Sequence, residues 1–160
     1  MTEESHEESG AAVRFPPPFV PLIALGVALA LEAAIGPILS EPTGLARWLI
    51  GAALLLAGIG CIAGAGGLFR KTGQDPKPWK PSPQLIAEGI YRWTRNPMYL
   101  GMCLSQAGLG ILFGTVWALA LVPVTGLVIY RIAIRHEETY LRSKFGADYE
   151  AYLGRVRRWL

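Results

Sequence analysis

The sequence predicts an all-α polytopic membrane protein, with four transmembrane helices followed by a C-terminal amphipathic helix at the membrane interface. Of the 160 residues, 52% are apolar and 17% are charged, which is less charge than a soluble domain usually carries. The apolar residues are grouped in runs that approach the roughly 20 residues needed to cross a bilayer core. We therefore expect one membrane domain over residues 15–160, preceded by an acidic, disordered tail over residues 1–14.

The four apolar runs define the predicted spans, which cover residues 19–39, 45–69, 97–113 and 116–134. Gly60, Gly64 and Gly67 share one face of the second span, a pattern that predicts close helix packing, with a ligand surface as the alternative. Pro123 and Gly126 are expected to kink the fourth span. The third and fourth spans are separated by a very short turn, which predicts a tight helical hairpin.

Basic residues are concentrated in the connection 70–96 and in the C-terminal segment 135–160, and the positive-inside rule places both in the cytosol. With four spans, the N-terminus is cytosolic too. The basic C-terminal segment directly follows an apolar helix, so we expect anionic membrane lipids as its partner and no nucleic acid. Within that segment, Gly146 is expected to end or break the amphipathic helix.

The two cysteines, Cys61 and Cys103, lie in separate apolar runs. Neither has a His or Cys at the spacing of a metal site, and thiols inside membrane helices are usually packing residues. We expect neither a metal nor a disulfide.

A first polar cluster opens the third span. Asn96 is expected to cap the helix, and Pro97 suits its first position. The backbone amides of Met98 and Tyr99 are then free to bind an anion such as a carboxylate. Gly101, one turn further, leaves room for a flat ligand. The alternative is that Asn96 and Pro97 simply start a helix.

A second polar cluster closes the fourth span with Arg131, Arg135, Glu137 and Glu138. One carboxylate could accept hydrogen bonds from ribose hydroxyls or an ammonium group while the other pairs with a cation. Arg131, Arg135 and Glu138 share a face at helical spacing, so plain ion pairing on a solvated helix end is the alternative. The hairpin brings both clusters to the same membrane face, where they form one cytosolic site.

Together these motifs resemble the isoprenylcysteine carboxyl methyltransferase and phospholipid methyltransferase superfamily. Arg95, Pro97 and Tyr99 match its Arg-His-Pro-x-Tyr motif, and Glu137 and Glu138 match its Glu-Glu pair. Asn96 stands where the eukaryotic type has His, which is similar to the bacterial branch and implies a bacterial inner membrane. The resemblance covers residues 68–160, and its C-terminal pattern includes Leu141, Phe145, Gly146, Tyr149, Tyr152 and Val156.

The resemblance implies an S-adenosylmethionine-dependent methyltransferase, with S-adenosylhomocysteine as product. The acceptor would be lipophilic, either an isoprenylcysteine carboxylate or a lipid head group, and would arrive laterally between helices. The implied catalytic residues, which would hold an acidic acceptor group, are Arg95, Arg131 and Arg135. The implied cofactor-binding residues are Tyr91, Asn96, Pro97, Met98, Tyr99, Gly101, Glu137 and Glu138, with Trp93 as a further aromatic for the adenine or the sulfonium.

Two other classes of function remain open. A sterol-reductase-like enzyme using NADPH shares the Arg-x-Pro-x-Tyr start, but such enzymes have more spans and a different acidic motif. A non-enzymatic membrane scaffold or small transporter would depend instead on Glu32 and the glycine face of the second span.

Overall fold

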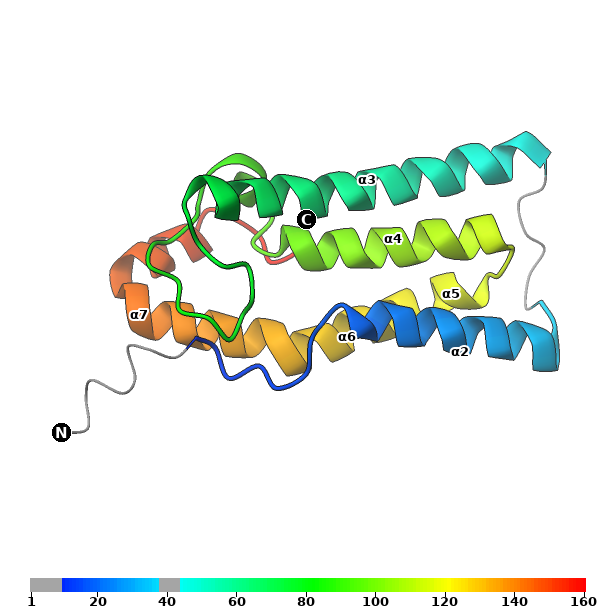
Figure 1. Cartoon of the computed structure of the whole chain (residues 1–160), viewed down its shortest axis with the longest axis horizontal. Helices are drawn as coiled ribbons and strands as arrows, with labels where there is room; N and C mark the ends of the chain where they lie inside the picture. The colour runs from blue at the N-terminus through cyan, green and yellow to red at the C-terminus, as the bar shows by residue number, and fades with distance from the viewer. Residues whose placement is uncertain (1–9, 38–43) are drawn as a thin grey trace.

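A computed structural model describes residues 10–37 and 44–160, and within these residues the secondary structure is entirely helical (Figure 1). The helices run nearly parallel or antiparallel along one long axis, with short connections at one end and the long connection 72–88 at the other. Their bounds are α2 (Phe19–Ile35), α3 (Gly44–Lys71), η1 (Gly89–Arg92), α4 (Pro97–Phe113), α5 (Trp117–Ala120), α6 (Val122–Ile129), η2 (Tyr130–Ile134) and α7 (Arg135–Leu153).

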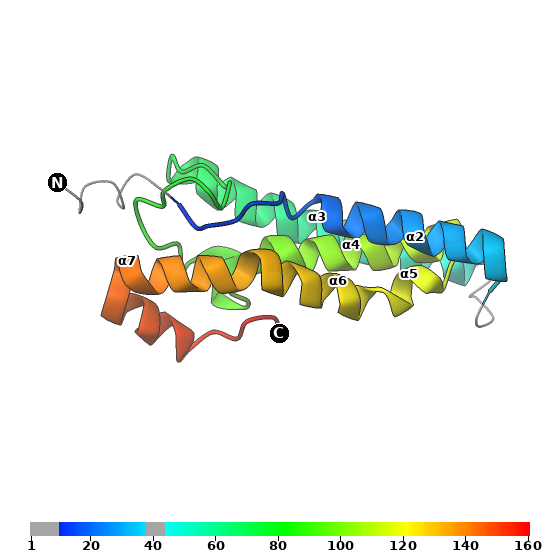
Figure 2. The same ribbon diagram turned by 90° about the horizontal axis from the view of Figure 1, so that it is seen from below.

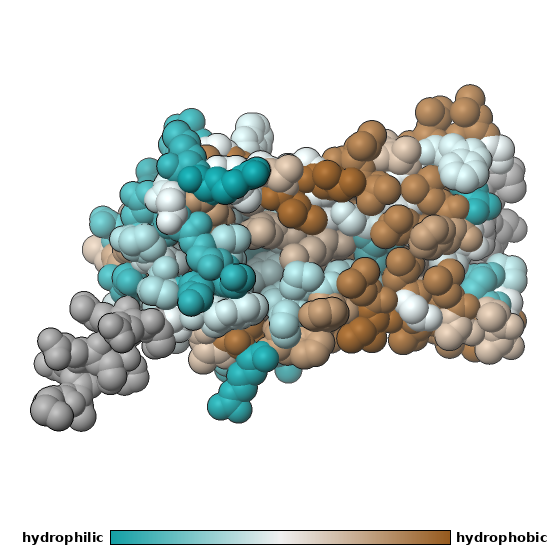
Figure 3. Space-filling model, viewed as in Figure 1, coloured by the Kyte–Doolittle hydropathy of each residue, from teal (hydrophilic) through white to brown (hydrophobic). Residues whose placement is uncertain are grey.

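Two of the described helices are long and apolar enough to cross a membrane, namely α3 and the continuous stretch Trp117–Leu153. The apolar helices α2 and α4 have 17 residues each. Hydrophobic side chains cover most of the bundle in Figure 3, whereas hydrophilic ones gather at the end that carries the long connection and α7. The predicted second and third spans coincide with α3 and α4; the predicted end of the first span, residues 38–39, lies outside the described residues.

The predicted fourth span is interrupted, as expected, but the break lies at Leu121, just ahead of Pro123, and Gly126 stays inside α6. A proline has no amide to donate, so a helix that meets one leaves carbonyl groups without partners. In the turn before this break, the Ala118 carbonyl accepts a hydrogen bond of 3.0 Å from Nε2 of the buried Gln106 side chain of α4. This polar contact therefore joins α4 to α5 inside an apolar bundle.

Four glycines let α3 and α4 approach closely, and they are not the glycines predicted from the sequence. A Cβ on Gly101 would lie 2.5 Å from the Gly58 carbonyl oxygen, and one on Gly108 would lie 2.7 Å from that of Gly51. A Cβ on Gly60 would meet no atom of the described residues within 4 Å. The predicted packing face of Gly60, Gly64 and Gly67 is thus wrong, because the face of α3 turned to α4 carries Gly51 and Gly58 instead.

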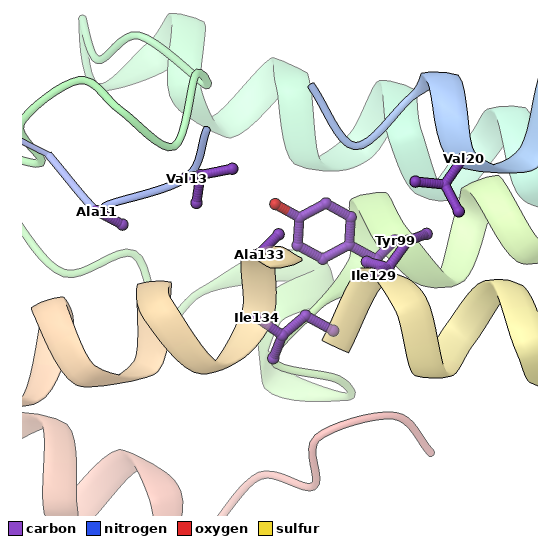
Figure 4. Close-up of a cluster of buried hydrophobic side chains, with 7 residues drawn as sticks. All are labelled: Ala11, Val13, Val20, Tyr99, Ile129, Ala133 and Ile134. Carbon is purple, nitrogen blue, oxygen red and sulfur yellow. The ribbon is translucent and has the colours of Figure 1, made fainter. Parts of the chain in front are cut away.

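The segment before α2 packs against the rest of the protein. The Ala11 amide donates to the Pro78 carbonyl at 2.8 Å, and both Ala11 and Val13 are buried. Figure 4 shows them in one cluster with Tyr99 and Ala133, which come from α4 and η2. The predicted tail boundary at residue 14 is therefore too late, whereas residues 1–9 lie outside the described part of the chain.

The chain reverses direction within α7. Gly146 has φ 47° and ψ −120°, a conformation that favours glycine, and it breaks the helix as predicted. Beyond it the C-terminal half of α7 and the last residues fold back toward the start of α4 (Figure 2). Tyr149, Tyr152 and Val156 are buried there, so this segment is part of the packed fold.

Candidate active site

A cavity lies where α4 begins and α7 begins, and the connection 74–86 and the returning C-terminal half of α7 complete its wall. The Tyr99 hydroxyl of α4 donates a hydrogen bond to Glu137 Oε1 of α7. The predicted meeting of the two polar clusters is therefore confirmed. Eight of the expected site residues line the cavity, namely Tyr91, Arg95, Asn96, Pro97, Met98, Tyr99, Glu137 and Glu138.

Glu137 is a partly buried carboxyl group facing this cavity. Burial, which disfavours the charged form, and the adjacent Glu138 charge raise the pKa of Glu137 to about 7, although the hydrogen bond from Tyr99 acts in the opposite direction. Its second oxygen has no hydrogen-bond partner among the described residues. Glu137 can therefore accept a hydrogen bond from a ligand.

Glu138 is buried and shared by two arginines. Arg158 binds it through two hydrogen bonds of 2.8 Å, from Nε to Oε1 and from Nη2 to Oε2. Arg95 Nη1 lies 3.4 Å from Glu138 Oε1, and the Nε of Arg95 is buried without a partner among the described residues. One carboxylate thus faces two guanidinium groups, which leaves a net positive charge beside the cavity.

The start of α4 differs from the prediction at Asn96. Pro97 occupies the first turn as expected, but the Asn96 side chain does not cap the helix. Its Nδ2 donates instead to the Arg158 carbonyl at 3.0 Å, and the buried Thr94 hydroxyl donates to the same oxygen at 3.2 Å. The first amides of α4 therefore remain free of a side-chain cap, which keeps them open to an anionic ligand.

Three of the expected site residues lie elsewhere. Arg131 and Arg135 are exposed and do not line the cavity. Glu138, which was expected to share a helix face with them, is buried. The π-helical turn η2 lies between α6 and α7, at the end of the predicted fourth span, and it changes the register on which the shared face of Arg131, Arg135 and Glu138 was predicted. Gly101 faces α3 rather than the cavity. These three placements correct the expectation for Arg131, Arg135 and Gly101.

The aromatic residues divide between the cavity and the surface. Tyr91 packs edge-on against Phe69, with ring centroids 6.4 Å apart, and burial raises its pKa. Its carbonyl accepts a hydrogen bond of 2.8 Å from the Tyr152 hydroxyl. Trp93 is 79% exposed and does not line the cavity, so its expected contact with a cofactor is wrong.

Sequence reasoning missed several residues of this cavity. Ala11 and the residues of 74–86 carry no motif, and only the fold brings them together. Tyr149 and Tyr152 belong to the C-terminal family pattern, which is the signal that could have placed them here. No motif indicated that Arg158 would reach this site. Its contact with Glu138 spans 20 residues and depends on the reversal of the chain at Gly146.

The fold and this cavity define a helical protein with an apolar bundle and a polar, charged pocket at one end of it. The chain belongs to the phospholipid methyltransferase family, whose model matches residues 46–148. It is 33% identical over 72 residues to a protein-S-isoprenylcysteine O-methyltransferase of Schizosaccharomyces pombe, a match that covers 45% of this chain and 30% of the yeast protein. It is 43% identical over 63 residues to an uncharacterized protein of Haemophilus influenzae, which are 39% of this chain and all of that protein. No solved structure matches the chain.

Proposed function

We propose that this protein is an integral membrane methyltransferase that transfers a methyl group from S-adenosylmethionine to a lipophilic acceptor. The observation that carries the proposal is the single cavity in which the free amides of α4, the Glu137 carboxyl group and the Arg95 guanidinium converge. Family membership supports the reaction class. The isoprenylcysteine carboxylate and a lipid head group are the two acceptor chemistries proposed.

The residues of the cavity fit the polar groups of S-adenosylmethionine. The amides at the start of α4 suit its carboxylate, and Glu137 suits its ammonium group or ribose diol. Glu138 is already held by Arg95 and Arg158, so we assign it a supporting role. The cofactor supplies an electrophilic methyl group, and the protein contributes alignment and exclusion of water.

The size of the cavity adds a requirement to this proposal. The enclosed space is about 110 Å³, whereas ligand pockets usually measure several hundred Å³. Binding of S-adenosylmethionine therefore requires the cavity to widen, and the connection 74–86, which forms part of its wall, is the segment that we expect to move.

A groove of about 490 Å³ between α4 and α6 supports a lipophilic acceptor. Most of its lining is apolar, including Leu100, Val122 and Leu127, and Tyr130 and Arg158 complete it. An apolar chain lying in this groove would place its polar end near Arg95, which would hold an acidic group of the acceptor.

We further propose that the chain from residue 10 onward forms one membrane domain, since Ala11 and Val13 pack into the same fold. In this arrangement α2, α3, α4 and the stretch from α5 through η2 each cross the bacterial inner membrane, with α2 and α4, of 17 residues each, as the shortest crossings. Both termini and the connection 70–96 would then lie in the cytosol, which gives the cavity access to soluble cofactor.

The affinity for S-adenosylhomocysteine should depend on pH through Glu137. If the ionised carboxylate binds the ligand, a pKa of about 7 makes binding roughly tenfold weaker near pH 6 than near pH 8. Calorimetric titrations of S-adenosylhomocysteine between pH 6 and pH 8 should show this change of affinity in the wild type. The affinity of Glu137→Gln should not change over the same range.

The effect of Glu137 on the stability of the fold has the opposite pH dependence. Its raised pKa contributes stability below the pKa of an unfolded glutamate, and this contribution is lost as pH rises through about 7.

Methyl transfer can be tested without knowing the acceptor. Purified protein is incubated with isotope-labelled S-adenosylmethionine and either a total bacterial lipid extract or a synthetic isoprenylcysteine, and the products are resolved by mass. A labelled lipid formed by the wild type but not by Glu137→Gln would support the proposal and identify the acceptor. Binding of NADPH in place of S-adenosylhomocysteine would contradict it and favour a reductase.

A further inference from the structure

The last residues of the chain return to the candidate active site. The Arg95 amide donates to the Arg157 carbonyl at 3.0 Å, and the side chains of Thr94 and Asn96 both donate to the Arg158 carbonyl. The C-terminal segment is therefore fixed along the stretch that leads into α4. These contacts place the Arg158 side chain between the start of α4 and the start of α7.

The Arg158 side chain binds Glu138 in a fixed geometry. Its two parallel hydrogen bonds of 2.8 Å hold both carboxylate oxygens, and its guanidinium lies 5.0 Å from the Tyr130 ring centroid. Such paired bonds set the orientation of a carboxylate as well as its position, which a lysine ammonium cannot do.

This ion pair separates two spaces. Glu138 lines the polar cavity, whereas Arg158 lines the apolar groove between α4 and α6. Under the proposed function the donor lies on one side of the pair and the acceptor chain on the other. The position of the pair therefore affects how the two reactants are aligned.

We propose that Arg158 is a positioning residue that acts through Glu138 on Arg95. Because Arg158 takes up both oxygens of Glu138, Arg95 makes only one contact of 3.4 Å with that carboxylate, and its charge stays available to an acidic group. Without Arg158, the two oxygens of Glu138 become free to bind Arg95 closely and neutralise it. This inference rests on the proposed methyl transfer.

The test compares binding with turnover in the full-length protein. Arg158→Ala and Arg158→Lys should bind S-adenosylhomocysteine within about threefold of the wild type, since the amides of α4 and Glu137 are untouched. The initial rate of labelled methyl transfer to the lipid extract should fall about 100-fold, the usual scale for a misplaced catalytic group. Millimolar guanidinium should restore part of the rate in Arg158→Ala, and an equal concentration of sodium chloride should not.

Arg157→Ala is the matched control, because Arg157 contacts the site through its backbone carbonyl alone. It should transfer methyl groups at the wild-type rate. A wild-type rate in Arg158→Ala would overturn the inference, and so would a rate that falls only with the folded fraction and is not restored by guanidinium. Failure of the wild type itself to transfer a methyl group to the lipid extract or to a synthetic isoprenylcysteine would instead refute the proposed function.

Discussion

Replacing Glu138 by glutamine should lower the free energy of unfolding by about 3–5 kcal/mol, because it removes the one carboxylate that faces two guanidinium groups. The side chains of Glu138 and Arg95 are only 10% and 13% exposed, whereas that of Arg158 is 38% exposed, so solvent replaces the lost charge only in part. Chemical denaturation of the detergent-purified protein measures the change.

Glu150→Gln is the control for that experiment. Glu150 also lies on α7 and also pairs with an arginine, Arg142, but both side chains are about half exposed. An exposed pair of this kind contributes about 0–1 kcal/mol. If the Glu138 and Glu150 variants lost the same stability, the buried cluster would not have the structural role described above.

Gly101→Ala should destabilise the bundle by about 1–3 kcal/mol, because the added methyl group would overlap the contact between α3 and α4. Its Cβ would lie 2.5 Å from the Gly58 carbonyl oxygen and 2.8 Å from Ile62 Cγ1. Since one of these neighbours is backbone, the helices must move apart to relieve the overlap. Thermal unfolding in detergent should show a lower midpoint.

Gly60→Ala provides the comparison, because Gly60 lies on α3 outside its interface with α4. An alanine there has open space within the described part of the chain and should be neutral or stabilising by up to about 1 kcal/mol, since alanine favours helix. A Gly101→Ala protein of unchanged stability that no longer binds S-adenosylhomocysteine would contradict this assignment and restore Gly101 to the ligand site.

Local sequence signals predicted the elements that depend on neighbouring residues. Helix α4 has the predicted bounds, because Pro97 suits the first turn and Gly114, with φ 74° and ψ 43°, ends the helix. The hairpin followed from this short turn, and with it the meeting of the two polar clusters at one end of the bundle. The helix bounds need only neighbouring residues, and the meeting of the clusters needs only the connectivity of the hairpin.

The wrong predictions concern residues whose position depends on the helical register or on contacts with distant parts of the chain. A π-helical turn cannot be seen in the apolar pattern, so Arg131 and Arg135 were placed on the face of Glu138. Asn96 is a residue type that often caps a helix, but its side-chain amide donates to the backbone carbonyl of Arg158, in the C-terminal segment that folds back to this point. Gly101 was assigned to the ligand site for a related reason. Only the position of α3 shows that close helix packing requires a glycine there.

Calorimetric titration of S-adenosylhomocysteine into the detergent-purified protein tests the central claim most directly. We expect saturable binding at one site per chain, weakened about tenfold or more in Glu137→Gln, since a hydrogen bond to a charged group contributes about 1.5–3 kcal/mol. Arg135→Gln, at an exposed residue outside the cavity, should bind as the wild type does. Absence of binding to folded wild-type protein, or equal binding by the Glu137 variant, would contradict the assignment of this cavity as the cofactor site.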